Sequence, residues 1–151
     1  RSVASRFQQI LQQKQLLYFA RISGDSPLCD PRTLTAAQAL ALSELPDGVS
    51  TALVDPFPSG MNVEVIKAAT FLSAYPSFST KDHFEHVTRY FYENKQKFTL
   101  LPLRCSVPNA QQFKFSFDDE QDRKRLERFF QKLDGPHYLL SLEEKIRLSS
   151  E

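Results

Sequence analysis

The chain has 151 residues, 41% of them hydrophobic and 25% charged, a composition typical of one globular domain with a substantial core. Its 19 basic and 18 acidic residues give a net charge of +1, so no basic excess indicates nucleic acid or a membrane surface as a partner. No apolar run approaches the ~20 residues of a membrane helix. Cys29 and Cys105 have neither metal-ligand spacing nor the pattern of a disulfide framework. We therefore expect a reducing, cytoplasmic location.

The first half of the chain alternates between helical and strand patterns. Residues 1–14 repeat apolar side chains with helical spacing. Residues 16–20 form a compact apolar run, typical of a buried strand, and an acidic turn follows it. Asp30 and Pro31 are favoured residues at the N-cap and at the first position of a helix. We expect helices over residues 1–14, 30–43 and 67–74, and strands over residues 16–20, 49–54 and 61–66.

The second half continues the same alternation. Ser79 and Asp82 fit a capping box at the start of a helix. Asp118 is expected to cap another helix, which Gly135 would end. We expect helices over residues 79–95, 118–133 and 141–147, and strands over residues 98–104 and 113–117. This alternation predicts an α/β layered domain with a mainly parallel sheet over residues 1–135, followed by a tail at 136–151.

Two aspartates, Asp25 and Asp118, would each lie at the end of a predicted strand, just where the next element begins. In open α/β sheets, ligands bind beyond the carboxyl ends of the strands. Two converging carboxylates there would suit Mg²⁺, which typically takes one or two carboxylates together with substrate phosphates. The simpler interpretation is that each aspartate only caps a turn or a helix, which is a favoured position for this residue.

Other polar residues are weaker candidates. Glu64 stands in an apolar strand, where a carboxylate needs a partner or a ligand. Arg6 and Arg21 are candidate anion binders, although solvated or ion-paired arginines are commoner. Glu85 and His86 lie inside a predicted helix, where such a pair is usually a surface feature. There is no glycine-rich phosphate loop, nucleophile elbow or zinc spacing. The residues alone therefore indicate an α/β domain with an acidic site suited to a metal.

Four short motifs, taken in order, resemble a known family. They are RISGDSPL at residues 21–28, GMNVEV at 60–65, EHVT at 85–88 with Tyr90, and FDDEQD at 117–122. The series resembles the cytidylyltransferases of the spore-coat polysaccharide type, which are relatives of the synthetases of CMP-sialic acid and CMP-3-deoxy-manno-octulosonate. The resemblance extends over nearly the whole chain, to about residue 133.

The resemblance implies a three-layer α/β/α nucleotide-diphospho-sugar transferase domain of Rossmann-like type, with a mainly parallel mixed sheet. It implies that a hydroxyl of a sugar or sugar acid attacks the α-phosphate of CTP and releases pyrophosphate, with Mg²⁺ neutralising charge. Asp25 and Asp118 match the metal positions. The substrate side would be formed by Arg6, Arg21, Glu64, Glu85, His86 and Thr88. Family members often pair, which is compatible with a homodimer.

The sequence also departs from the family pattern. Asn62 stands where the family usually has Asp, and Arg89 where it usually has Pro. The family's glycine-rich nucleotide-binding loop has no counterpart in the 151 residues, so the resemblance implies the carboxyl-terminal two thirds of an enzyme. We therefore expect the isolated chain to be inactive. Two alternatives stay open: a non-catalytic binding or assembly domain that keeps the fold, and an unrelated α/β domain whose turns coincide with the motifs.

Overall fold

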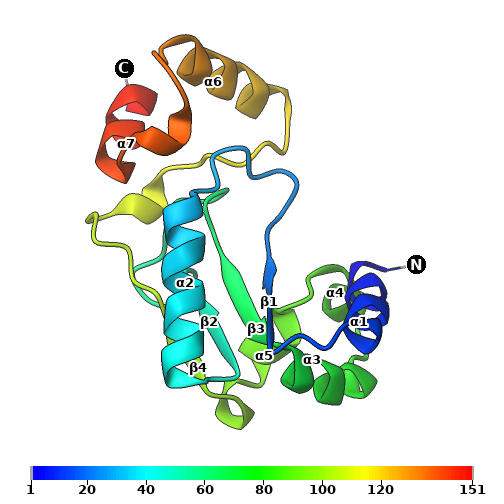
Figure 1. Cartoon of the computed structure of the whole chain (residues 1–151). Helices are drawn as coiled ribbons and strands as arrows, with labels where there is room; N and C mark the ends of the chain where they lie inside the picture. The colour runs from blue at the N-terminus through cyan, green and yellow to red at the C-terminus, as the bar shows by residue number, and fades with distance from the viewer. Residues whose placement is uncertain (1, 151) are drawn as a thin grey trace.

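The computed structural model describes residues 2–150, and Figure 1 shows the arrangement of their helices and strands. The helices are α1 (Val3–Gln13), α2 (Pro31–Glu44), α3 (Ala68–Ala74), α4 (Lys81–Glu85), α5 (Arg89–Glu93), α6 (Glu120–Gln131) and α7 (Leu142–Ser150). The strands are β1 (Tyr18–Arg21), β2 (Gly48–Ser50), β3 (Glu64–Lys67) and β4 (Leu100–Pro102). Single 3-10 turns are η1 (Tyr75–Ser77), η2 (Lys95–Lys97), η3 (Ala110–Gln112) and η4 (His137–Leu139). The predicted mixed α/β character is therefore confirmed.

The four strands of the described chain form one sheet in the order β1-β3-β2-β4. β3 runs antiparallel to both neighbours, pairing Val65 with Ala20 on β1 and with Val49 on β2, whereas β4 is parallel to β2. The sheet is mixed, as predicted, and three strands share one direction. It is not mainly parallel in its pairing, because the reversed strand β3 lies between β1 and β2. A buried apolar run does not reveal the direction of its strand, so the sequence pattern could not show this reversal.

Helices cover both faces of this sheet. Successive side chains of β3 point to opposite faces, so neighbouring residues of β3 pack against different helices. Val65 packs in one buried cluster with Ala37 and Ala41 of α2. Ile66 packs in another cluster, with Phe19 of β1 and Phe71 of α3, to which α1, α4 and α5 also contribute. Figure 1 shows α2 in front of the sheet, with α1, α3 and α4 grouped at the lower right.

A third cluster joins α6 and α7, which lie above the sheet in Figure 1, to the segment before α6. Phe129 of α6 packs edge-on against Phe115, with ring centroids 5.9 Å apart, and Ile146 of α7 adds to the same cluster. The fully buried Lys145 of α7 forms an ion pair with Asp30, 2.8 Å away, at the start of α2. The helix that was expected in the tail is therefore present as α7 and is tied to the body of the domain.

The helix expected over residues 79–95 is broken into α4 and α5. The capping box lies one residue later than predicted: Thr80 accepts a hydrogen bond from the amide of His83, and the His83 side chain accepts one from the amide of Thr80. His86 leaves the helical conformation, with φ −104° and ψ 76°. The break allows the buried Thr88 to reach Glu64 on β3, a contact that an uninterrupted pattern of helical residues could not reveal.

The strand expected over residues 113–117 is wrong, since only a single parallel bridge joins Lys114 to Ser59 there. The amides that would extend a ladder on either side of Ser59 are bonded elsewhere: Phe57 donates to the carbonyl of Thr51, and Met61 donates to that of Pro58. Consequently the aromatic residues do not share one face: Phe115 is buried, whereas Phe117 is about half exposed.

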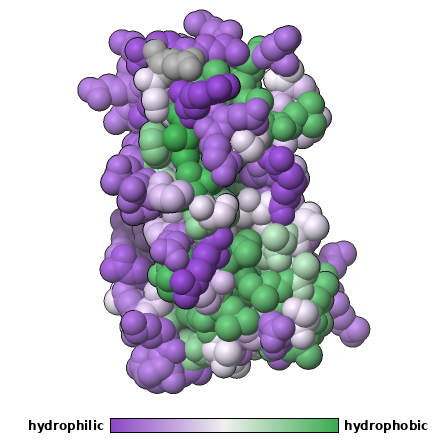
Figure 2. All heavy atoms as spheres, turned by 90° about the vertical axis from the view of Figure 1, so that its left-hand side faces the viewer, coloured by the Kyte–Doolittle hydropathy of each residue, from purple (hydrophilic) through white to green (hydrophobic). Residues whose placement is uncertain are grey.

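The molecular surface is uneven. On the face shown in Figure 2, apolar side chains gather in the lower part. Elsewhere on that face hydrophilic side chains predominate. Leu42 and Leu45, at the end of α2, are among the exposed large hydrophobic residues. Within residues 2–150, no helix combines the length and the apolar character needed to cross a membrane.

Candidate functional site

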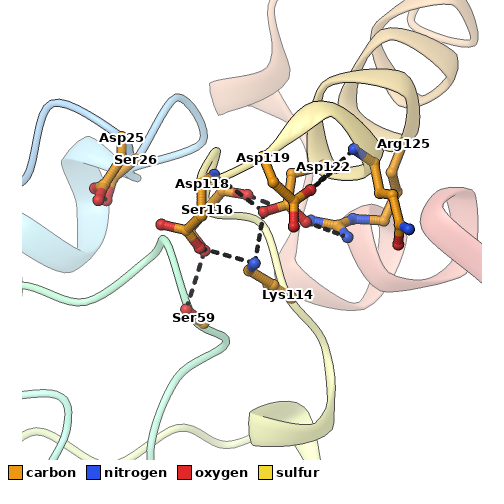
Figure 3. A network of polar contacts seen from close by, with 10 residues as sticks. Asp25, Ser26, Ser59, Lys114, Ser116, Asp118, Asp119, Asp122 and Arg125 are labelled. Carbon is orange, nitrogen blue, oxygen red and sulfur yellow. Dashed lines mark hydrogen bonds and ion pairs between the residues drawn. The ribbon is translucent and has the colours of Figure 1, made fainter.

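A cavity of about 180 Å³ lies just beyond the end of β1 and brings together both aspartates that the sequence singled out. The backbone amide of Phe117 donates a hydrogen bond to the carbonyl of Asp25 (2.9 Å), which fixes the loop after β1 against the segment before α6. Figure 3 shows Asp25 on one side and Asp118 on the other. The cavity is lined by Arg21, Ser23, Asp25, Ser26, Ser59, Gly60, Asn62, Ser116 and Asp118.

Asp25 offers an accessible carboxylate to this cavity. Its side chain is exposed, and its one hydrogen-bond partner among residues 2–150 is the hydroxyl of Ser26, at 3.1 Å. The carboxylate caps neither a helix nor a backbone turn in the described chain. The simpler interpretation, a capping role, therefore has no structural support at Asp25.

Asp118 is also free of a capping role, because its neighbour performs it. Asp119 is the N-cap of α6 and accepts hydrogen bonds from the backbone amides of the first turn. Asp118 instead forms a salt bridge with Lys114 (2.8 Å) and accepts a hydrogen bond from the hydroxyl of Ser116 (2.9 Å). These two contacts, led by Lys114, hold the pKa of Asp118 below its ordinary value, so the group is a carboxylate at neutral pH. The expectation that Asp118 itself caps the helix is wrong by one residue.

Behind Asp118 lies a second carboxylate, that of the buried Asp122. The Asp122 carboxylate lies 2.5 Å from Nζ of Lys114 and 2.8 Å from Nη1 of Arg125, and it accepts a hydrogen bond from the backbone amide of Asp118 at 3.0 Å (Figure 3). The hydrogen bond from Lys114, supported by the other two, holds the pKa of Asp122 well below its usual range. Lys114 is therefore shared by two carboxylates, which fixes the segment that carries Asp118.

On the other side of the cavity, Arg21 is held by a buried polar cluster around Glu64. Glu64 lies 3.1 Å from Nη1 of Arg21 and accepts a hydrogen bond from Thr88 at 2.8 Å. It also accepts one from the hydroxyl of Tyr92, which lies 2.8 Å from the hydroxyl of Ser50. Burial, and then the charge of Glu64, raise the pKa of Tyr92 far above its ordinary value, so the phenol remains a proton donor.

This cluster gives Glu64 and Arg21 different roles. Three protein groups already occupy the Glu64 oxygens, so Glu64 positions the guanidinium of Arg21. Arg21 has five N–H donors and lines the cavity, and Glu64 takes one of its nitrogens. The remaining donors suit a phosphate or carboxylate ligand.

The loop opposite Asp118 depends on one glycine. Gly60 has φ +83°, and a Cβ added there would lie 2.2 Å from the backbone nitrogen of Ser116. Only glycine allows this conformation and this close approach together. Next to it, Ser59 accepts a hydrogen bond from the amide of Phe115 and donates its own to Phe113, which holds the two cavity walls at a fixed distance.

We expect Gly60→Ala to lower the free energy of unfolding by about 2 kcal/mol, because it adds both a clash and backbone strain. Gly24→Ala is the matched control, since a Cβ there meets nothing within 4 Å. Gly135→Ala isolates the strain, because Gly135 has φ +120° with open space around it. Urea denaturation should rank the losses as Gly60, then Gly135, then Gly24. A loss at Gly60 no larger than at Gly135 would contradict the close-approach argument.

Not all predicted residues meet at the cavity. Arg6 is exposed on α1, and Glu85 and His86 are exposed at the end of α4; none of the three lines the cavity. Thr88 does not line the cavity either; its hydroxyl donates a hydrogen bond to Glu64, which in turn holds Arg21. Several contributors could not be predicted from the sequence, because their roles arise from distant partners. They are Ser23, Ser59, Asn62, Tyr92, Lys114, Ser116 and Asp122.

The carboxylates of the cavity are the groups on which a bound magnesium ion would depend. Within residues 2–150, no group of three or more His, Cys, Asp or Glu side chains could hold a metal ion. Asp25 and Asp118 are nevertheless two exposed carboxylates on one cavity, and Mg²⁺ often binds through one or two carboxylates plus phosphate oxygens and water. The residues therefore fit a magnesium ion that is shared with a phosphate-bearing ligand.

Comparisons with known proteins add information about the fold. No protein-family model and no curated protein matches the sequence. Among solved structures, the chain is similar to a cytidylyltransferase from Leptospira borgpetersenii serovar Hardjo-bovis (strain JB197), with a TM-score of 0.85 and 18% sequence identity. The match covers 99% of this chain and 62% of the other, so the chain spans less than two thirds of that protein's length. The likeness shows that the chain has the fold of this cytidylyltransferase.

Proposed function

We propose that the chain is the larger part of a cytidylyltransferase that transfers CMP from CTP to a sugar or sugar acid, with release of pyrophosphate, in surface polysaccharide biosynthesis. The observation that carries the proposal is the meeting of Asp25, Asp118 and Arg21 around one cavity in a fold similar to that of a cytidylyltransferase. We also propose the finer fold class, a three-layer Rossmann-like nucleotide-diphospho-sugar transferase domain. The four motifs, in the order that the family has them, support the same assignment.

In this proposal, Asp25 and Asp118 hold Mg²⁺, which supplies neutralisation of phosphate charge when it is bound. Lys114 keeps Asp118 ionised and oriented through its 2.8 Å salt bridge. Arg21 binds a negatively charged substrate group, such as the carboxylate of a sugar acid. Glu64 holds the guanidinium of Arg21 in place, so that binding does not have to order it.

The remaining substrate assignments rest on the family resemblance. Arg6, Glu85 and His86 are exposed outside the cavity, so in this proposal they contact a substrate or a second subunit that extends beyond it. The nucleotide-binding loop of the family has no counterpart in the sequence, and we propose that the isolated chain does not turn over CTP. A homodimer is part of the same proposal.

A pyrophosphate-release assay tests this function. The full-length gene product is supplied with CTP, Mg²⁺ and a panel of sugars and sugar acids, and the 151-residue chain is assayed beside it. We expect release by the gene product with at least one acceptor and no release by the isolated chain. Release by neither, with every acceptor, would favour the non-catalytic binding or assembly domain. Release by the isolated chain would contradict the proposed need for a separate nucleotide-binding loop.

A further inference from the structure

A second cavity, of about 450 Å³, lies between α6 and the end of α7, and its α6 wall is basic. Arg125, Arg128 and Lys132 recur at helical spacing, so they share one face of α6. All three line the cavity, with Phe129 of the same helix and Leu148 of α7 as apolar walls. The charge of this wall indicates a site for an anion.

The positive charge of this wall is only partly neutralised. Within residues 2–150, no carboxylate pairs with Arg128, whose Nε donates only a long hydrogen bond (3.3 Å) to the carbonyl of Lys124. Lys132 donates to a carbonyl, that of Leu148, at 3.0 Å. By contrast, Arg123 on the same helix is paired with two glutamates. The basic side chains that face the cavity therefore retain unused donors and charge.

Arg125 adds an independent observation. Its Nη1 pairs with Asp122 at 2.8 Å, but its Nε is buried and has no hydrogen-bond partner in the described part of the chain. A buried N–H without a partner costs free energy, and a ligand oxygen that accepted its hydrogen bond would remove this cost. The Nη2 of Arg125 donates a hydrogen bond to the carbonyl of Ser116 at 3.3 Å, so Nε is the one nitrogen of Arg125 that lacks an acceptor in the described part of the chain.

We propose that this cavity binds a phosphate group, either as the free ion or as an ester on a small organic molecule. Arginine donors fit phosphate oxygens in pairs, and Arg128 has its two terminal nitrogens available for this, while Arg125 adds its unpartnered Nε and Lys132 adds charge. The site is linked to the first cavity by a chain of ion pairs: Arg125 pairs with Asp122, Asp122 with Lys114, and Lys114 with Asp118. A bound phosphate would therefore act on the network that orients Asp118. The proposal does not rest on the cytidylyltransferase assignment.

The test is a titration of the ¹⁵N-labelled chain with inorganic phosphate and with glucose 6-phosphate, with glucose as the uncharged control. We expect saturable amide shifts at residues 125–132 and 148–150 with one or both phosphates and none there with glucose. Tighter binding of one phosphate identifies the source of the ligand. No saturable shifts at these residues, or shifts confined to the cavity of Asp25 and Asp118, would overturn the proposal.

A pair of charge-matched variants separates a built site from general attraction. Arg128→Gln removes an exposed cavity arginine and is expected to weaken binding about tenfold, the loss of one charge-assisted contact. Arg104→Gln removes the same charge at an exposed arginine that pairs with Asp55 and does not line the cavity. Unchanged affinity in Arg104→Gln supports the site. An equal loss in both variants would mean non-specific attraction and would overturn it. CTP is absent throughout, so the result is independent of the proposed enzymatic function.

Discussion

Lys145→Ala is expected to lower the free energy of unfolding by about 3 kcal/mol, because the buried Asp30 carboxylate loses one of its two cations and the fully buried lysine side chain leaves a cavity. Lys145 is fully buried, and its Nζ lies 2.8 Å from the carboxylate of Asp30. The variant removes one of two cations from Asp30; the other is Arg32, at 2.7 Å. Urea denaturation measures the loss. Arg147→Ala, an exposed basic residue on the same helix, is the control and should change stability by less than about 0.5 kcal/mol.

The same ion pair predicts a pH dependence of stability. Burial alone would raise the pKa of Asp30, but hydrogen bonds from Arg32 and Lys145 outweigh it and hold that pKa well below its ordinary value. A carboxylate with a depressed pKa stabilises the fold above its unfolded pKa of about 3.9, and this stability is lost as the pH falls below that value. Lys145→Ala should therefore reduce the loss of stability between about pH 5 and pH 2. Equal pH profiles, or equal losses in the Lys145 and Arg147 variants, would contradict this role.

The residues around Asp30 illustrate what local pattern can predict. Asp30 and Pro31 begin α2 as expected, and Asp30 accepts the backbone amide of Arg32 as an N-cap should. Its second role, as the partner of Lys145, joins residues that are 115 positions apart. No local rule predicts that a lysine in an amphipathic tail helix will be fully buried. The cap was thus predictable, and the ion pair was not.

In the candidate site, too, local features were predictable from the sequence and long-range contacts were not. Asp25 and Asp118, which line the cavity, could be predicted as candidates because each follows an apolar run. The sequence does not show, however, which of the adjacent Asp118 and Asp119 caps the helix and which faces the site. The backbone decides: Asp119 is extended, with φ −146° and ψ −179°, and takes the cap, which leaves Asp118 free. Tyr92 was missed because its contact with Glu64 requires the helical break before α5.

Asp25→Asn is expected to weaken divalent-metal binding at the first cavity by at least about tenfold, since a neutral amide replaces a full carboxylate ligand. The measurement is paramagnetic broadening of amide signals by Mn²⁺, used in place of Mg²⁺, in the ¹⁵N-labelled chain with pyrophosphate present. In the unmodified chain, broadening should centre on residues 23–26 and 116–119, which border the cavity. Asp134→Asn is the matched control, because it removes the same charge from an exposed residue outside the cavity.

Asp118→Asn should have a smaller effect than Asp25→Asn on the same measurement. Lys114 already neutralises part of the Asp118 charge, whereas Asp25 contacts only a hydroxyl. If neither variant reduces broadening at residues 23–26 and 116–119, the two carboxylates do not hold a metal. If Asp134→Asn reduces it as much as Asp25→Asn does, the broadening reports net charge instead of a site. Loss of broadening in Asp25→Asn alone would place the metal on the carboxylate of the loop after β1, with Asp118 serving to orient Lys114.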